Sequence, residues 1–211
     1  MQKIRIIFEK TGTAKFISHL DLVRVVTRAI RRAHIPIVYS QGFNPVPRLS
    51  FALPLSLGQE SLREMMNFKV EPDMTPEEAM QRLATQLPDG LILKKAYVPE
   101  DVKGCELQYA RYTISIEDEF DTDKARECFE RDEITLIKKT KSGEKLTDIK
   151  PLIKEISVSD KSIECVLNSK DPCFLNPEYV MKALSEYLQK SFERYYILRK
   201  EVYTDKMELY R

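Results

Sequence analysis

Four arginines occupy one short segment of the sequence, and a stiff polar loop follows it. The segment RVVTRAIRRA carries Arg24, Arg28, Arg31 and Arg32. Guanidinium groups are planar, permanently charged donors whose geometry matches pairs of phosphate oxygens. Because neighbouring groups of this kind neutralise several phosphates together, the segment predicts affinity for a polyanion that weakens as salt rises.

The helical period places these arginines on one face of a helix that runs to about residue 33. At ~100° per residue they fall within a stripe about 100° wide. The opposite face is apolar and is formed by Leu22, Val25, Val26, Ala29, Ile30 and Ala33. Asp21 is the one acid near the arginines in sequence, and like charges at i, i+4 repel. We expect an anion-binding surface; the alternative is a solvated face, or arginines paired with acids from elsewhere in the fold.

The loop YSQGFNPVPRLSF combines several groups that contact nucleotides. Tyr39 and Phe43 can stack on bases or pack in a core, and Gln41 and Asn44 can pair with base edges. Its prolines restrict the backbone, so ordering the loop costs less entropy. The alternative is a purely structural loop. The candidate nucleic-acid-binding set is Lys15, His19, Arg24, Arg28, Arg31, Arg32, Tyr39, Gln41, Phe43, Asn44 and Arg48.

The sequence shows no clear catalytic constellation. Ser18, His19 and Asp21 supply the residue types of a triad, but neighbours at a helix start fit capping better. An RNA-cleaving enzyme that uses His19 with Lys15 and a tyrosine remains an alternative. The widely spaced cysteines, Cys105, Cys128, Cys165 and Cys173, form no metal or cluster motif with the two histidines. We expect reduced cysteines, no catalytic residue, no metal and no cofactor.

The charge of the chain is strongly asymmetric, although its net value is only +1. Residues 1–58 contain nine Lys/Arg and two Asp/Glu, giving +7, and the remaining residues give −6. Such asymmetry suggests an anionic partner for the first quarter of the chain. There is no run of eighteen apolar residues and no apolar segment typical of a signal peptide. We therefore expect a cytoplasmic protein without a membrane partner; the sequence does not specify an oligomeric state.

The order of predicted elements indicates an α+β fold made of two similar halves. In the first half a strand, a helix, three strand-like runs (IPIVYS, RLSFALPL and EMMNFKVE), a helix from Thr75 and a last strand follow one another. The second half repeats this order, with a helix at 177–190 capped by Asn176. We predict two tandem ferredoxin-like βαββαβ sandwiches, residues 1–102 and 108–211, each an antiparallel sheet with helices on one face. The segment PEDVKGCELQ is typical of a linker between them.

The stretch KFISHLDLVRVVTRAIRRAHIPIVYSQGFNPVPRLSFALPLSLGQES resembles the signature of the bacterial radical-SAM-linked protein family, a domain of unknown function. The matching positions are Lys15, Phe16, Ser18, His19, Asp21, Arg24, Arg28, Arg31, Arg32, Ser40, Gly42, Phe43, Asn44, Pro45, Pro47, Ser50, Phe51, Gly58, Ser61 and Glu64. One position departs from the pattern, since relatives often have histidine where this chain has Val46. If that imidazole took part in chemistry, this chain lacks it.

The resemblance implies a working partner and loosely implies a substrate. A domain of this kind is encoded beside, or fused to, a radical SAM enzyme, and that enzyme rather than this chain would hold the iron–sulfur cluster. The family's gene association with a ribonuclease and ribosomal proteins points towards RNA. The tandem plan also resembles repeat-associated RNA-binding proteins of CRISPR systems.

We therefore expect a non-catalytic RNA-binding accessory protein that works with a radical SAM enzyme, in tRNA or rRNA modification. One alternative is a protein-interaction module that docks this enzyme through the arginine face without RNA. The other alternative is the ribonuclease-like enzyme based on His19.

Overall fold

The computed structural model describes residues 1–100, 106–140 and 143–211. The chain has a mixed α+β fold, as predicted, and divides into two compact units. Unit 1 is Met1–Gly104 together with Arg211, and unit 2 is Cys105–Tyr210. The predicted linker falls partly on residues 101–105, which lie outside the described residues. Among the helices that are described, none has the length and apolar character needed to cross a bilayer.

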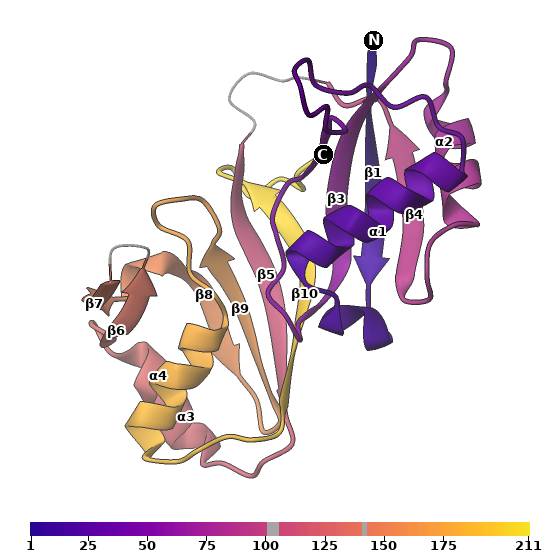
Figure 1. Ribbon diagram of the computed structural model, residues 1–211. Coiled ribbons are helices and arrows are strands. Elements are labelled where there is room, and N and C mark those ends of the chain that lie inside the picture. Colours follow the sequence, from indigo (N-terminus) through magenta and orange to yellow (C-terminus); the bar gives the residue numbers. More distant parts are fainter. Residues whose placement is uncertain (101–105, 141–142) are drawn as a thin grey trace. The chain divides into compact units, whose positions relative to one another are not determined.

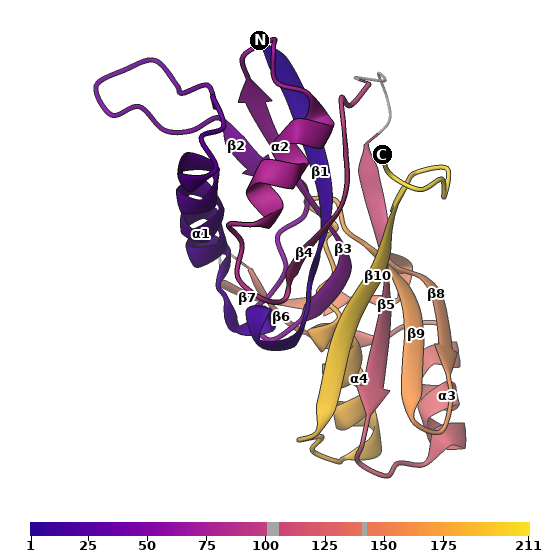
Figure 2. The same ribbon diagram turned by 90° about the vertical axis from the view of Figure 1, so that its right-hand side faces the viewer.

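Unit 1 packs two helices on one face of an antiparallel sheet (Figures 1 and 2). Its strands lie in the order β4-β1-β3, and β2 pairs with β3. All three pairings are antiparallel. In chain order the elements are β1 (Gln2–Lys10), the 3-10 helix η1 (Gly12–Phe16), α1 (His19–Arg32), β2 (Leu49–Phe51), β3 (Glu60–Val70), α2 (Pro76–Ala84) and β4 (Leu91–Tyr97).

The core of unit 1 lies between this sheet and the helices. Ile4, Ile6 and Phe8 alternate along β1 and are almost fully buried. They belong to one apolar cluster with Val26 and Ile30 of α1. Because an amphipathic helix buries its apolar stripe, this packing fixes which face of α1 remains outside.

Both ends of α1 are closed by local hydrogen bonds. The Ser18 hydroxyl accepts from the Asp21 backbone N–H and donates to the Asp21 carboxylate. At the other end, His34 adopts a left-handed conformation with φ of 52°. The amide of His34 donates to the carbonyl of Arg31, and the amide of Ile35 donates to that of Ile30, which is the pattern of a Schellman cap. The helix therefore presents a fixed length of about four turns.

The strands between α1 and α2 differ from the sequence prediction. The segment IPIVYS forms no strand and makes only isolated bridges, from Ile37 to Val70 and from Tyr39 to Pro47. Prolines lack the N–H that a regular ladder requires, which limits pairing around Pro36 and Pro47. The run RLSFALPL shortens to three residues of β2, whereas β3 extends over eleven.

Unit 2 also has two helices against one face of an antiparallel sheet (Figure 1). Its strand order is β10-β5-β9-β8, and β6 and β7 form a separate two-stranded sheet. Leaving that hairpin aside, the order is last, first, third, second, as it is in unit 1. The elements are β5 (Leu107–Ile116), α3 (Thr122–Glu130), β6 (Thr135–Thr140), β7 (Gly143–Asp148), η2 (Lys150–Leu152), β8 (Ile153–Val158), β9 (Ser162–Asn168), α4 (Glu178–Leu188) and β10 (Tyr195–Thr204).

The start of α4 differs from the prediction by one residue. Pro177, not Asn176, is the N-cap residue. The Asn176 side chain nevertheless accepts a hydrogen bond from the backbone N–H of Glu178, 3.1 Å away. The asparagine therefore satisfies a free amide of the first turn from one position further out.

Gly90, the residue just before β4, allows the backbone to lie close to Thr11 at the start of η1. Gly90 has a φ of +84°, and a Cβ atom there would lie 2.3 Å from the Thr11 carbonyl oxygen. Gly58 has nearly the same φ, +83°, but a Cβ atom there meets nothing within 4 Å. We predict that Gly90→Ala lowers the free energy of unfolding by at least ~2 kcal/mol more than Gly58→Ala, because the clash adds to the same backbone strain.

Urea unfolding followed by circular dichroism measures this difference. Equal losses in the two variants would show that backbone strain alone, and not contact with Thr11, requires glycine at position 90.

Candidate nucleic-acid interface

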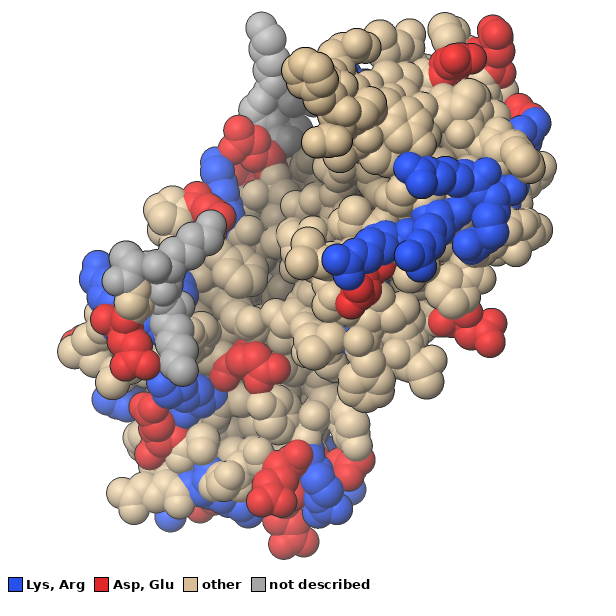
Figure 3. All heavy atoms as spheres, in the orientation of Figure 1, with Lys and Arg blue, Asp and Glu red and all other residues tan. Residues whose placement is uncertain are grey.

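The exposed face of α1 carries the arginine stripe, Arg24, Arg28, Arg31 and Arg32. All four residues are exposed. Figure 3 shows them as a nearly continuous band of positive charge along α1, with acidic atoms touching it at one end. The buried apolar face described above dictates this outward orientation.

Within the described residues, one carboxylate is bound to the stripe. Arg24 Nη1 lies 2.8 Å from Asp21 Oδ1. Hydrogen bonds from Ser18 and then from Arg24 lower the pKa of Asp21 below its ordinary value. Asp21 therefore stays negatively charged at neutral pH and offsets the charge of one guanidinium group.

Two of the other arginines donate to neutral oxygen atoms. Arg31 Nε donates to the Tyr39 hydroxyl at 3.3 Å. Arg32 donates to the Gln86 side-chain oxygen at 3.2 Å and to its backbone carbonyl at 2.6 Å. Within the described part of the chain, the Arg28 side chain makes no hydrogen bond or ion pair. The stripe therefore keeps three positive charges that no carboxylate among the described residues balances.

The loop after α1 is closed at its base and open at its tip. Arg48 N donates to Val38 O and Ser40 N donates to Val46 O, each at 2.8 Å. The Ser40 hydroxyl also accepts from Val46 N at 3.0 Å. Figure 2 shows this loop, between α1 and β2, projecting away from the sheet. Paired backbone at the base fixes the two ends of the loop.

The tip presents the residues that the sequence suggested for base contacts. Gln41, Phe43 and Asn44 are exposed, and the Phe43 ring has no shielding at all. Tyr39 is only half-buried and lies at the base, where its hydroxyl holds Arg31. A fully exposed aromatic ring costs hydration free energy unless a partner covers it, so Phe43 is available for stacking.

Lys15 lies in η1 and His19 is the first residue of α1, so neither belongs to the loop. The Lys15 ammonium sits 5.4 Å from the ring centre of Phe16. The half-buried His19 ring meets the Phe51 ring edge-on, with centroids 5.6 Å apart. Ser18 and Asp21 form hydrogen bonds with each other that cap α1. The Ser, His and Asp residues in this segment are therefore explained by helix capping and not by a catalytic triad. The imidazole packs against an aromatic ring.

Arg48 faces a different surface, together with residues that the sequence prediction missed. It lines an open hollow of about 250 Å³ with Lys3, Ser50, Asn67 and Lys69 on the sheet face turned away from α1. Strand alternation could have indicated that Asn67 and Lys69 share one face, because Phe68 between them is buried. Their proximity to Lys3 could not be read from sequence, since it depends on the pairing register.

The structure shows no candidate metal centre within residues 1–100, 106–140 and 143–211. Cys128 and Cys165 are buried free thiols, and Cys173 is an exposed one. Burial raises the pKa of Cys128 to about 11 and that of Cys165 to about 12. These two thiols stay protonated at neutral pH, so they are poor nucleophiles.

The sequence matches, over residues 3–195, a family described as "uncharacterized protein conserved in bacteria (DUF2344)". The chain belongs to this family. The arginine stripe and the loop lie within the matched range, and most of both units does too, so these features are part of the family domain. No match was found among curated proteins.

Solved structures show only remote similarity. The small subunit of acetolactate synthase from Thermotoga maritima is 12% identical with a TM-score of 0.25, covering 94% of each chain. A CRISPR-associated protein from Thermus thermophilus is 13% identical with a TM-score of 0.25, covering 93% of this chain and 99% of that one. Similarity at this level carries no information about function.

The Ser40 hydroxyl bond makes a testable contribution to the loop. Ser40→Ala removes the acceptor for Val46 N, so we predict a drop in the NMR order parameters of residues 41–45. The global stability should change by less than ~1 kcal/mol because the bond is exposed. Gln41→Ala, which alters the tip without touching the closing bond, serves as the control. Unchanged tip order in Ser40→Ala would mean that the backbone pairing and the prolines hold the loop without this side-chain bond.

Proposed function

We propose that this protein is a non-catalytic RNA-binding accessory protein that works with a radical SAM enzyme in modifying tRNA or rRNA. The observation that carries the proposal is the arginine stripe, with three guanidinium groups that lack a carboxylate partner in the described chain, beside a loop with an exposed aromatic tip. RNA supplies both phosphates for the first feature and unstacked bases for the second.

The two features would divide the work of recognition. Arginines spaced along α1 would neutralise successive phosphates and hold the RNA without regard to sequence. Phe43 would stack on a splayed base while Gln41 and Asn44 read its edge. Arg31 links the two features physically, because its Nε bonds to Tyr39 at the base of the loop.

The fold gives such a site a rigid support. We infer that each unit is a ferredoxin-like sandwich and that the chain is a tandem repeat of this plan. The identical order of strands in the two sheets, once the β6–β7 hairpin is set aside, supports the inference. A site on a packed helix is positioned more firmly than one on loops alone.

The radical SAM partner is inferred from the family resemblance of the stretch from Lys15 to Ser61. That enzyme would carry the cluster and perform the chemistry, while this protein would hold the substrate. The surroundings of His19 favour an accessory role over RNA cleavage. Its ring packs on Phe51, and the nearby Asp21 is engaged by Ser18 and Arg24.

Removing two arginines from the stripe should weaken RNA binding in a salt-dependent way. We predict that Arg28→Ala/Arg31→Ala lowers affinity for tRNA and reduces the slope of log K against log salt by about 1 per arginine. Filter binding at several salt concentrations measures both. Lys94→Ala/Lys95→Ala on β4 is the matched control, because it removes the same charge from the same unit.

Absence of RNA affinity, or an equal loss in both double variants, would reject the proposal. Copurification with the radical SAM enzyme after nuclease treatment separates the two roles of the stripe. If the Arg28→Ala/Arg31→Ala variant loses the enzyme without RNA present, the stripe docks protein and not RNA.

A further inference from the structure

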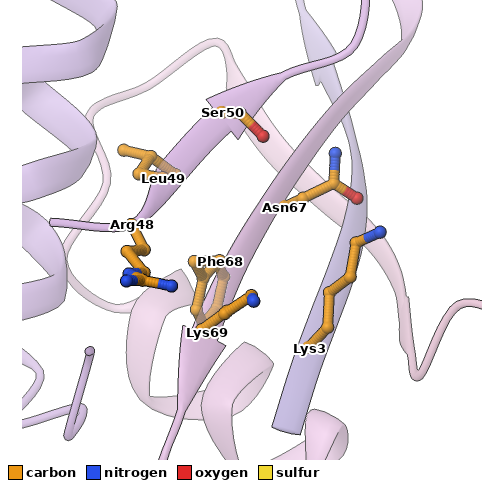
Figure 4. A pocket seen from close by; sticks show the side chains of 7 residues that line it. All are labelled: Lys3, Arg48, Leu49, Ser50, Asn67, Phe68 and Lys69. Atoms are coloured by element: carbon orange, nitrogen blue, oxygen red, sulfur yellow. The ribbon is translucent and has the colours of Figure 1, made fainter. Parts of the chain in front are cut away.

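The hollow beside β2 has the composition of an anion site. Figure 4 shows Lys3 from β1, Asn67 and Lys69 from β3, and Arg48 and Ser50 from the β2 segment around one space. Three of these residues are cations, and the lining contains no acidic side chain. The volume of about 250 Å³ is large enough for a phosphate group with part of the molecule that carries it.

Strand register forces two of the cations together. Lys3 of β1 lies directly opposite Lys69 of β3 in the antiparallel ladder. Like charges at such cross-strand positions destabilise a sheet. Both lysines are half-buried, so water screens their repulsion less than it would at an open surface. An anion bound between them would relieve this repulsion.

The neutral residues of the hollow are arranged as donors. Arg5 Nε donates to Asn67 Oδ1 at 2.7 Å, which uses the acceptor of that amide and leaves its N–H groups to face a ligand. Ser50 pairs with Asn67 across β2 and β3. Among the residues that the structure describes, the side chains of Ser50, Arg48 and Lys69 hold no hydrogen-bond or ion-pair partner. Arg48 and Ser50 are exposed, so their donors are accessible to a ligand that carries acceptor atoms.

We propose that this hollow binds a phosphate group. Arg48 and Lys69 supply charge-assisted hydrogen bonds, and Ser50 and Asn67 supply neutral ones. Lys3 adds electrostatic attraction from the neighbouring strand. The phosphate belongs either to a small phosphorylated molecule such as a nucleotide or to an RNA backbone.

The hollow is distinct from the arginine stripe. Leu49 and Phe68 also line the hollow, but both belong to or pack against the apolar core of unit 1. Asn67 and Lys69 flank the buried Phe68 along β3 and therefore point to the other side of the strand. The polar residues of the hollow therefore occupy the opposite face of the sheet. Phosphate binding here does not depend on RNA binding at α1, and each can fail without the other.

Titration of the full-length 15N-labelled protein with inorganic phosphate, then with a nucleoside monophosphate, tests the proposal. We expect saturable amide shifts at residues 48–50 and 67–69. Arg48→Ala and Lys69→Ala should each weaken binding about tenfold or more. Lys95→Ala, an exposed lysine of the same unit, should bind as the wild type does.

The two sources are separated by a short RNA oligonucleotide added to the Arg28→Ala/Arg31→Ala variant. Saturation of the hollow by the oligonucleotide at lower concentration than by the mononucleotide assigns the site to RNA, and the reverse assigns it to a small ligand. Shifts that do not saturate, or that Lys95→Ala reduces as much as Lys69→Ala does, would overturn the proposal.

Discussion

An excess of guanidinium charge on one helix face is the constraint on which the rest of this account depends. Among the described residues, the stripe binds one carboxylate, that of Asp21, through Arg24. Arg31 and Arg32 use neutral oxygen atoms instead, which orient the side chains but cancel no charge. Within a helix this arrangement costs free energy through repulsion. An external anion would offset this repulsion between the arginines. The unbalanced charge therefore supports the proposal that the stripe binds an anionic partner.

The fold converts that charge into a directed surface. Burial of Val26, Ala29 and Ile30 fixes the rotation of α1, and the caps at Ser18 and His34 fix its ends. The loop is then held at its base by backbone pairing and at Tyr39 by Arg31. A rigid helix and a rigid loop base mean that little conformational entropy is lost when a ligand binds.

Patterns among neighbouring residues predicted α1 well. They did not predict contacts between residues that are far apart in the sequence. The 3.6-residue period found the buried face, and the spacing of Ser18 and Asp21 found the cap, because both depend on neighbours in sequence. The strand predicted at 35–40 was wrong, since prolines interrupt the ladder there and only bridges form. The hollow was missed because the register of β1 on β3 brings Lys3 to Lys69, which are far apart in sequence.

The central claim is that three guanidinium groups of the stripe have no carboxylate partner among the described residues. It is tested most directly by the stability of Arg28→Gln at low and high salt. Glutamine resembles arginine in helix propensity but carries no charge. The account predicts that Arg28→Gln raises the free energy of unfolding by ~0.2–0.5 kcal/mol at low salt and that the gain disappears at high salt. A loss of ~1 kcal/mol or more at low salt would contradict it, because that loss requires a carboxylate already paired with Arg28.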